Sequence, residues 1–158
     1  MFDFFAGKSS APASRLAGQF LFSGLKAREL KILETFMHER RYLAGEIVFD
    51  EGEDGQALYL ILSGSVLICH PGHSDQPIAS LEAGNLFGEM ALIDDSPRVA
   101  QARAGETAEL AVLFRGDFER LMETHAHIAS RIAIQLARLL GQRLRQMVSS
   151  QGGGQAWS

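Results

Sequence analysis

The spacing of apolar residues divides the chain into three stretches. From Leu25 to His38, apolar residues recur at helical intervals between Lys, Arg and Glu, which predicts an amphipathic helix. The middle of the chain carries short runs rich in Ile, Val, Leu, Phe and Tyr, separated by Gly, Asp and Pro, and this pattern is typical of strands. After Arg115 the helical spacing returns. We expect Asp117 to cap a short helix that ends near Met122, followed by a long helix from about Ala126 to Val148.

The middle stretch is expected to contain a series of short strands. We place them near residues 46–50, 57–62, 65–69, 77–81, 99–104 and 109–114. The turns between them are expected at Gly45, Gly52, Gly55, Gly64, Gly72 and Gly84. Many short strands joined by glycine turns favour a mainly β fold of the barrel or jelly-roll kind, with helices at its flanks.

The length of 158 residues fits one domain, which we place at residues 16–148. Residues 1–15 contain a small, polar, proline-broken segment and are expected to form a flexible N-terminal arm. Residues 149–158 are glycine-rich and are expected to form a disordered tail. No residues follow the long helix from which a helix-turn-helix unit could be built, so a stand-alone module without direct DNA binding is expected.

Composition excludes several classes of protein. The formal charge of −4 argues against a general nucleic-acid-binding surface, and no apolar run approaches the roughly 20 residues of a membrane-spanning helix. Cys69 is the single cysteine, which fits a reducing compartment, and we expect a cytoplasmic protein. No metal site is expected, because His125 and His127 are two apart on a helix and face different sides.

The segment "NLFGEMALIDDSPRVAQA", residues 85–102, combines a largely apolar sequence with the carboxylate of Glu89 and the guanidinium of Arg98, which must be solvated, paired with each other or bound to a ligand. Arg98 offers a planar fork of donors suited to phosphate oxygens, and Gly88 to Ala91 can form a tight turn whose N–H groups converge on the same anion. Glu89 beside a phosphate is favourable only if it accepts a hydrogen bond from a sugar hydroxyl or pairs with Arg98. A cyclic nucleotide supplies one phosphate and one free ribose hydroxyl, whereas an internal Glu89–Arg98 ion pair would need no ligand.

The sequence "FGEMALIDDSPRVA" resembles the phosphate-binding cassette of the cyclic nucleotide-binding domain family, in its catabolite activator-type form. The upstream "AGEIVFDEGEDGQALYLILSGSV" resembles the first strands of the same family, and the likeness extends from about Phe22 to Met147. The resemblance implies an eight-stranded β-roll, similar to a jelly roll, with an N-terminal helix and a long C-terminal helix.

The resemblance also assigns roles within the cassette. It implies that Glu89 binds the ribose 2′-hydroxyl, that Arg98 pairs with the cyclic phosphate, and that backbone amides at Ala91 and Val99 add to the phosphate site. The expected ligand-binding residues are therefore Gly88, Glu89, Met90, Ala91, Arg98 and Val99. Val99 stands where the family often has alanine, serine or threonine, and its side chain offers no hydroxyl to guanine. We therefore expect cAMP to bind more tightly than cGMP.

The leading hypothesis is a non-enzymatic cyclic nucleotide sensor without a cofactor. Its C-terminal helix would signal to an unidentified effector protein or to a second copy in a homodimer, and Arg131, Gln135 and Arg138 are within reach to cover the base. One alternative is a module of the same fold that binds no ligand or binds a cyclic dinucleotide. Another is a small cupin-type metalloenzyme, for which the strand region offers only His70 and His73 as histidine ligands.

Overall fold

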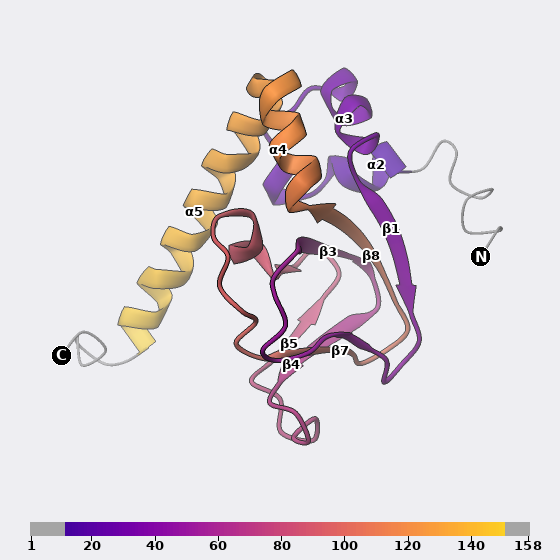
Figure 1. The fold of residues 1–158 in the computed structure, drawn as a ribbon, viewed down its shortest axis with the longest axis vertical. Coiled ribbons are helices and arrows are strands. Elements are labelled where there is room, and N and C mark those ends of the chain that lie inside the picture. Colours follow the sequence, from indigo (N-terminus) through magenta and orange to yellow (C-terminus); the bar gives the residue numbers. More distant parts are fainter. Residues whose placement is uncertain (1–11, 151–158) are drawn as a thin grey trace.

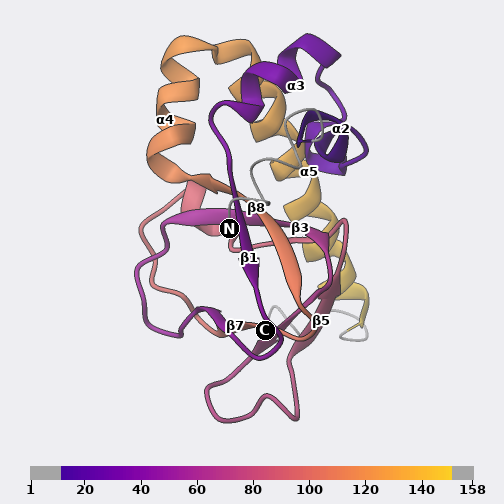
Figure 2. The ribbon, with the colours of Figure 1, turned by 90° about the vertical axis from the view of Figure 1, so that its right-hand side faces the viewer.

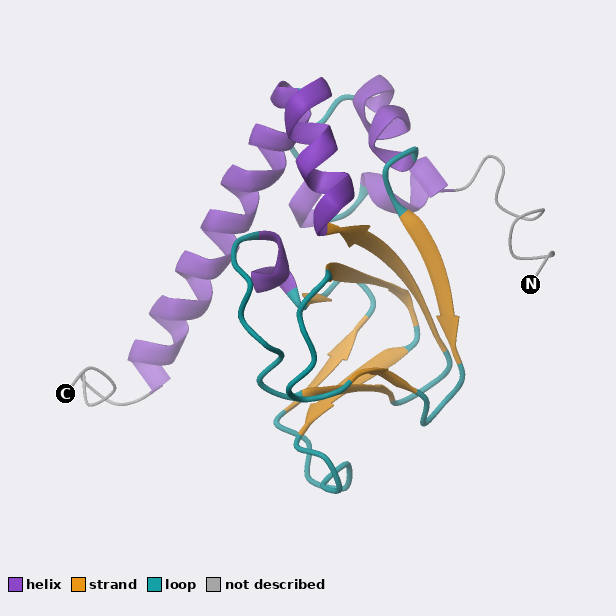
Figure 3. Cartoon of the chain, in the orientation of Figure 1, coloured by secondary structure: helices purple, strands orange, loops and turns teal. Residues whose placement is uncertain are grey.

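Two four-stranded antiparallel sheets form a β-roll in the computed structural model, which describes residues 12–150 (Figure 1, Figure 3). The first sheet has the order β1 (His38–Tyr42), β8 (Ala108–Phe114), β3 (Ala57–Ser63), β6 (Leu86–Phe87). The second sheet has the order β2 (Ile47–Phe49), β7 (Gln101–Ala104), β4 (Ser65–Cys69), β5 (Ala79–Glu82). The prediction of an eight-stranded β-roll with flanking helices is confirmed.

The helices gather at one end of the roll, and the last one continues along its side (Figure 1, Figure 2). They are α2 (Pro12–Ala17), η1 (Phe20–Phe22), α3 (Ala27–Glu34), α4 (Arg115–Thr124) and α5 (Ala126–Ser150), and a short 3-10 helix, η2 (Glu89–Leu92), lies between β6 and β7. None of the helices described is long and apolar enough to cross a membrane.

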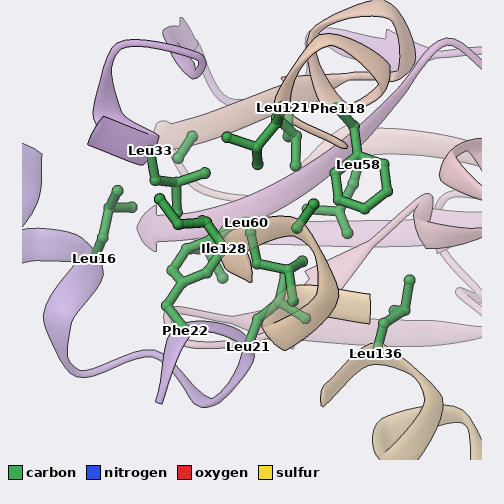
Figure 4. Packing of buried hydrophobic residues seen from close by; sticks show 14 of the residues in the cluster. Leu16, Leu21, Phe22, Leu33, Leu58, Leu60, Phe118, Leu121, Ile128 and Leu136 are labelled. Atoms are coloured by element: carbon green, nitrogen blue, oxygen red, sulfur yellow. The ribbon is translucent and has the colours of Figure 1, made fainter. Parts of the chain in front are cut away.

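Strand β3 explains how the helices attach to the roll. Its side chains alternate, so that Leu58 and Leu60 face the helices while Ala57 and Ile61 face the interior between the sheets. Because both faces of the strand are buried, its sequence is an almost continuous apolar run. The helix-side cluster is completed by residues of the flanking helices, several of which are labelled in Figure 4: Leu16, Leu21, Phe22, Leu33, Phe118, Leu121, Ile128 and Leu136.

Glycine turns link the strands largely where the sequence predicts them. Five of the six predicted turn glycines have positive φ, the exception being Gly55. Gly64, between β3 and β4, has φ +83°, and a Cβ added there would lie 2.1 Å from the Thr107 carbonyl oxygen. Only glycine fits this hairpin without moving the neighbouring backbone.

The predicted helix from Leu25 to His38 is wrong at its C-terminal end. α3 stops at Glu34, and His38 begins β1, which pairs with β8 along its whole length from His38↔Val112 to Tyr42↔Ala108. The sequence of β1, HERRY, has no apolar alternation because this strand lies at the edge of its sheet and its residues are exposed or half-buried.

Other predicted boundaries also need correction. Strand β6 is too short for a periodic pattern, and β7 begins at Gln101 rather than Val99. The N-cap of α4 is Phe114, not Asp117, because β8 runs directly into the helix. α2 begins within the predicted arm and α5 ends two residues into the predicted tail. The rest of the arm and tail, residues 1–11 and 151–158, lies outside the described residues.

Candidate functional site

A cavity of about 550 Å³ opens where the roll, the segment around η2 and the second half of α5 meet. Its volume is in the range of small-molecule sites. The walls are mainly apolar, and the polar groups come from a few residues on one side. The lining residues are Phe49, Ile68, Ala79, Leu81, Leu86, Phe87, Gly88, Glu89, Met90, Ala91, Ser96, Pro97, Arg98, Val99, Ala100 and Arg143. All six residues predicted to bind ligand are among them.

Arg98 is held at the cavity by backbone carbonyls. Its Nη1 donates to the Gly88 oxygen at 3.1 Å and its Nη2 donates to the Ala57 oxygen at 2.7 Å, while the guanidinium lies 4.0 Å from the centre of the Phe49 ring. The residue is only 9% exposed, and burial lowers the pKa of its guanidinium. Within residues 12–150, the buried Nε finds no hydrogen-bond acceptor. The site therefore contains a desolvated cation with a donor to spare, which favours an anionic ligand.

The backbone around Arg98 requires glycine at position 88. Gly88 has φ +74°, and a Cβ there would lie 2.8 Å from Arg98 Nη1. Of the two amides expected at the phosphate, that of Val99 has no acceptor among the described residues. The Ala91 N–H instead donates to the Gly88 oxygen at 3.2 Å.

Glu89 does not pair with Arg98. Its Oε2 lies 3.1 Å from Nη1 of Arg143, a residue of α5, and its side chain is 13% exposed. Arg143 also donates from Nη2 to the Leu86 carbonyl oxygen at 3.1 Å. The internal Glu89–Arg98 ion pair that the sequence left open is therefore absent from the described structure, and a different arginine partners the carboxylate.

The remaining predicted residues lie toward the opening. Met90 is 44% exposed and Val99 is 85% exposed. Neither side chain is therefore buried in the wall of the cavity, and both are free to contact a bound molecule.

Comparison with known proteins supports the resemblance found in the sequence. A model of the cyclic nucleotide-binding domain matches residues 39–125, more than half of the chain. The chain belongs to the cyclic nucleotide-binding domain family.

Relatives of the chain in this family include regulatory proteins. The chain is 39% identical over 127 residues to a cyclic AMP receptor protein of Thermus thermophilus, covering 79% of this chain and 59% of that protein. It is 37% identical over 102 residues to a cAMP-dependent protein kinase regulatory subunit of Emericella nidulans, covering 65% of this chain and 24% of that subunit. The chain thus spans less than two thirds of these relatives' lengths.

The fold is also that of a solved cyclic nucleotide-binding domain. The crystal structure of such a domain from Methylobacillus flagellatus superposes with a TM-score of 0.78 at 26% sequence identity, covering 87% of this chain and 81% of that one.

In this family member, the long helix meets the cavity through a residue that sequence reasoning missed. Arg143 lines the cavity, whereas the predicted candidates lie elsewhere on α5. Gln135 donates to the Phe20 oxygen at 3.1 Å and accepts from Arg138 at 2.7 Å, and the Arg131 side chain packs beside Gly24. None of these three residues lines the cavity, whereas Arg143, further along α5, does.

A second arginine secures the outer side of the cassette, which we define as residues 87–100. Arg115, the first residue of α4, donates from Nε to the Ala91 oxygen at 2.7 Å and from Nη2 to the oxygens of Gly55 at 2.6 Å and Asp94 at 3.0 Å. Its Nη1 contacts the Asp95 carboxylate. α4 is thereby joined directly to the cassette.

No side chains in residues 12–150 group three or more His, Cys, Asp or Glu in a way that could hold a metal ion. His70 lies 3.2 Å from Glu51 in an exposed pair. The buried Cys69 contacts Gln101. These residues lie outside the cavity and play no part in the arrangement described above.

Proposed function

We propose that this chain is a non-enzymatic cyclic nucleotide sensor that binds cAMP, and cGMP more weakly, without a cofactor. The observation that carries the proposal is the buried Arg98 guanidinium, which lines a cavity of about 550 Å³ and whose Nε has no acceptor among the described residues. A cyclic phosphate supplies the missing acceptor, and its single negative charge compensates for the desolvated cation.

The other groups of the cavity fit the remaining parts of the nucleotide. The phosphate would pair with the Arg98 guanidinium and accept a hydrogen bond from the free N–H of Val99. The ribose 2′-hydroxyl would donate to Glu89, whose carboxylate is largely buried. The base would lie against the apolar side of the cavity, where Ile68, Leu81 and Leu86 offer surface without hydrogen-bonding groups.

The preference for cAMP follows from the lack of an acceptor beside Arg98. The side chain of Val99 is 85% exposed at the cavity and has no oxygen. A guanine placed against it would leave its 2-amino donor unpaired, at a cost of about 1–3 kcal/mol if that donor is buried. Adenine has no such group.

The signal would leave the domain through α5. The helix carries exposed apolar residues on its free surface, namely Ile134, Leu144 and Met147, which are 48%, 45% and 51% exposed. These residues would contact an effector protein or the same helix of a second copy. Direct DNA binding and membrane association are not part of the proposal, and a cytoplasmic location remains an expectation.

A thermal shift measurement with a panel of nucleotides tests the ligand. Binding to the native state raises Tm by mass action, so cAMP should raise it most, cGMP less, and 5′-AMP least. A larger rise with a cyclic dinucleotide would support that ligand instead. No rise with any nucleotide would favour the ligand-free module, and a rise with divalent metal alone would favour the cupin-type alternative.

Hydrogen exchange with and without cAMP tests whether ligand binding changes α5 as well as the cavity. Changed protection should appear in residues 128–144 of α5 as well as in the cassette. Protection confined to the β-roll would show that α5 is a passive cover.

A further inference from the structure

Among the described residues, Arg143 is the only residue in the C-terminal half of α5 that contacts a charged group of the cavity. The buried residues of α5 end at Leu136, and Arg143 lies two turns further along, with its side chain 40% exposed. Its guanidinium contacts Glu89 Oε2 at 3.1 Å and the Leu86 oxygen at 3.1 Å. Both partners line the cavity.

The ion pair occupies only half of the Glu89 carboxylate. Oε2 is taken by Arg143, while Oε1 has no hydrogen-bond or ion-pair partner among the described residues. A carboxylate has acceptor sites on both oxygens, so a ligand hydroxyl can bond to Oε1 without displacing the arginine. The carboxylate is then fixed in orientation before the ligand arrives.

We propose that Arg143 is a positioning residue for Glu89, which makes the site selective for a ligand that carries a free ribose hydroxyl and connects α5 to that hydroxyl. This inference rests on the proposed function, because it assigns a role within the same nucleotide site. The chain supplies a matched control in Arg145, an exposed arginine of the same helix that does not line the cavity.

The test is a calorimetric titration of cAMP and 2′-deoxy-cAMP into the wild type, Arg143→Ala, Arg143→Lys and Arg145→Ala. The wild type should prefer cAMP by about tenfold or more, as for one hydrogen bond to a charged group. Arg143→Ala should lower the affinity for cAMP about five- to tenfold. It should change the affinity for 2′-deoxy-cAMP by no more than about twofold, so that the preference for cAMP disappears. Arg143→Lys should retain part of the preference and Arg145→Ala all of it.

Each other outcome overturns the inference in a recognisable way. Equal weakening of both ligands by Arg143→Ala would mean that the arginine contacts the phosphate or base directly. Tighter binding of both would mean that it competes with the ligand for Glu89. An unchanged preference would show that Glu89 needs no positioning. If the wild type binds neither nucleotide, the proposed function fails, and this inference fails with it.

Discussion

The two faces of the cassette are each held by an arginine, and the two arginines differ in how completely their donors are used. On the outer face, every nitrogen of the Arg115 guanidinium has an acceptor, and three of these acceptors are backbone oxygens. On the inner face, Arg98 bonds two carbonyls through its terminal nitrogens, and its buried Nε has no acceptor among the described residues.

The difference separates a structural role from a binding role. A buried donor without a partner costs about 1–3 kcal/mol, and folding alone offers no compensation for that cost at Arg98. Under the proposed function, an anion in the cavity would compensate for the buried charge of the inner arginine. The outer arginine already uses each of its three nitrogens to bond protein oxygens, and it holds the cassette against α4. Replacing Arg98 should therefore lower mainly the affinity for ligand, and replacing Arg115 should lower mainly the free energy of unfolding.

The largest effect is expected from Arg98→Ala. Removing the guanidinium leaves the phosphate charge buried without its fork of donors, which should cost about 3–5 kcal/mol of cAMP affinity. Competition against a fluorescent cyclic nucleotide measures the loss. Arg98→Lys keeps the charge but lacks the fork, so it should bind with intermediate affinity. Wild-type affinity in Arg98→Ala would contradict the assignment.

Arg115→Ala should act mainly on stability. It leaves the oxygens of Ala91, Gly55 and Asp94 without their donor, and the free energy of unfolding should fall by about 2–4 kcal/mol. Urea unfolding followed by circular dichroism measures this loss. The fully folded variant should keep more cAMP affinity than Arg98→Ala does. Normal stability with abolished binding would instead place Arg115 in the ligand site.

Glu89→Ala should weaken cAMP binding by about 1–3 kcal/mol through loss of the hydrogen bond to the ribose hydroxyl. The same calorimetric titration with 2′-deoxy-cAMP provides the control, because that ligand has no hydroxyl to lose. If both ligands weaken equally, Glu89 acts through the fold of the cassette rather than through the ribose.

The smallest effect is expected from Val99→Thr, at the rim of the inner face. The new hydroxyl can accept from the guanine 2-amino group, so cGMP affinity should rise by about 0.5–1.5 kcal/mol while cAMP affinity stays the same. A competition titration of both nucleotides against both proteins measures the change. A wild-type preference for cGMP, or no response of cGMP to threonine, would show that the base is recognised elsewhere.

Most of the fold could be predicted because the buried strands and helices carry strong periodic patterns. β4 was predicted with its observed bounds, and β3 and β8 within one residue at each end, since their apolar runs are buried on both faces. β1 could not be predicted from its pattern: its polar sequence forms a strand only because β8 offers a complete backbone partner. That pairing is tertiary and leaves no periodic signal in HERRY.

The candidate site shows the same division. Glu89 and Arg98 could be predicted because the local sequence brings them to one segment, and both line the cavity. Arg143 could not, because its contact with Leu86 joins residues 57 positions apart and depends on where α5 lies against the roll. The helical pattern of α5 indicates which side is apolar, but it does not show which arginine reaches the cavity.

The central claim is that the inner arginine, Arg98, binds a cyclic phosphate, and calorimetric titration of cAMP into the wild type and Arg98→Ala tests it most directly. The account predicts saturable heat in the wild type, with one cAMP bound per chain, and none in Arg98→Ala at the same concentrations. Absence of heat in the wild type, or equal binding by both proteins, would contradict it.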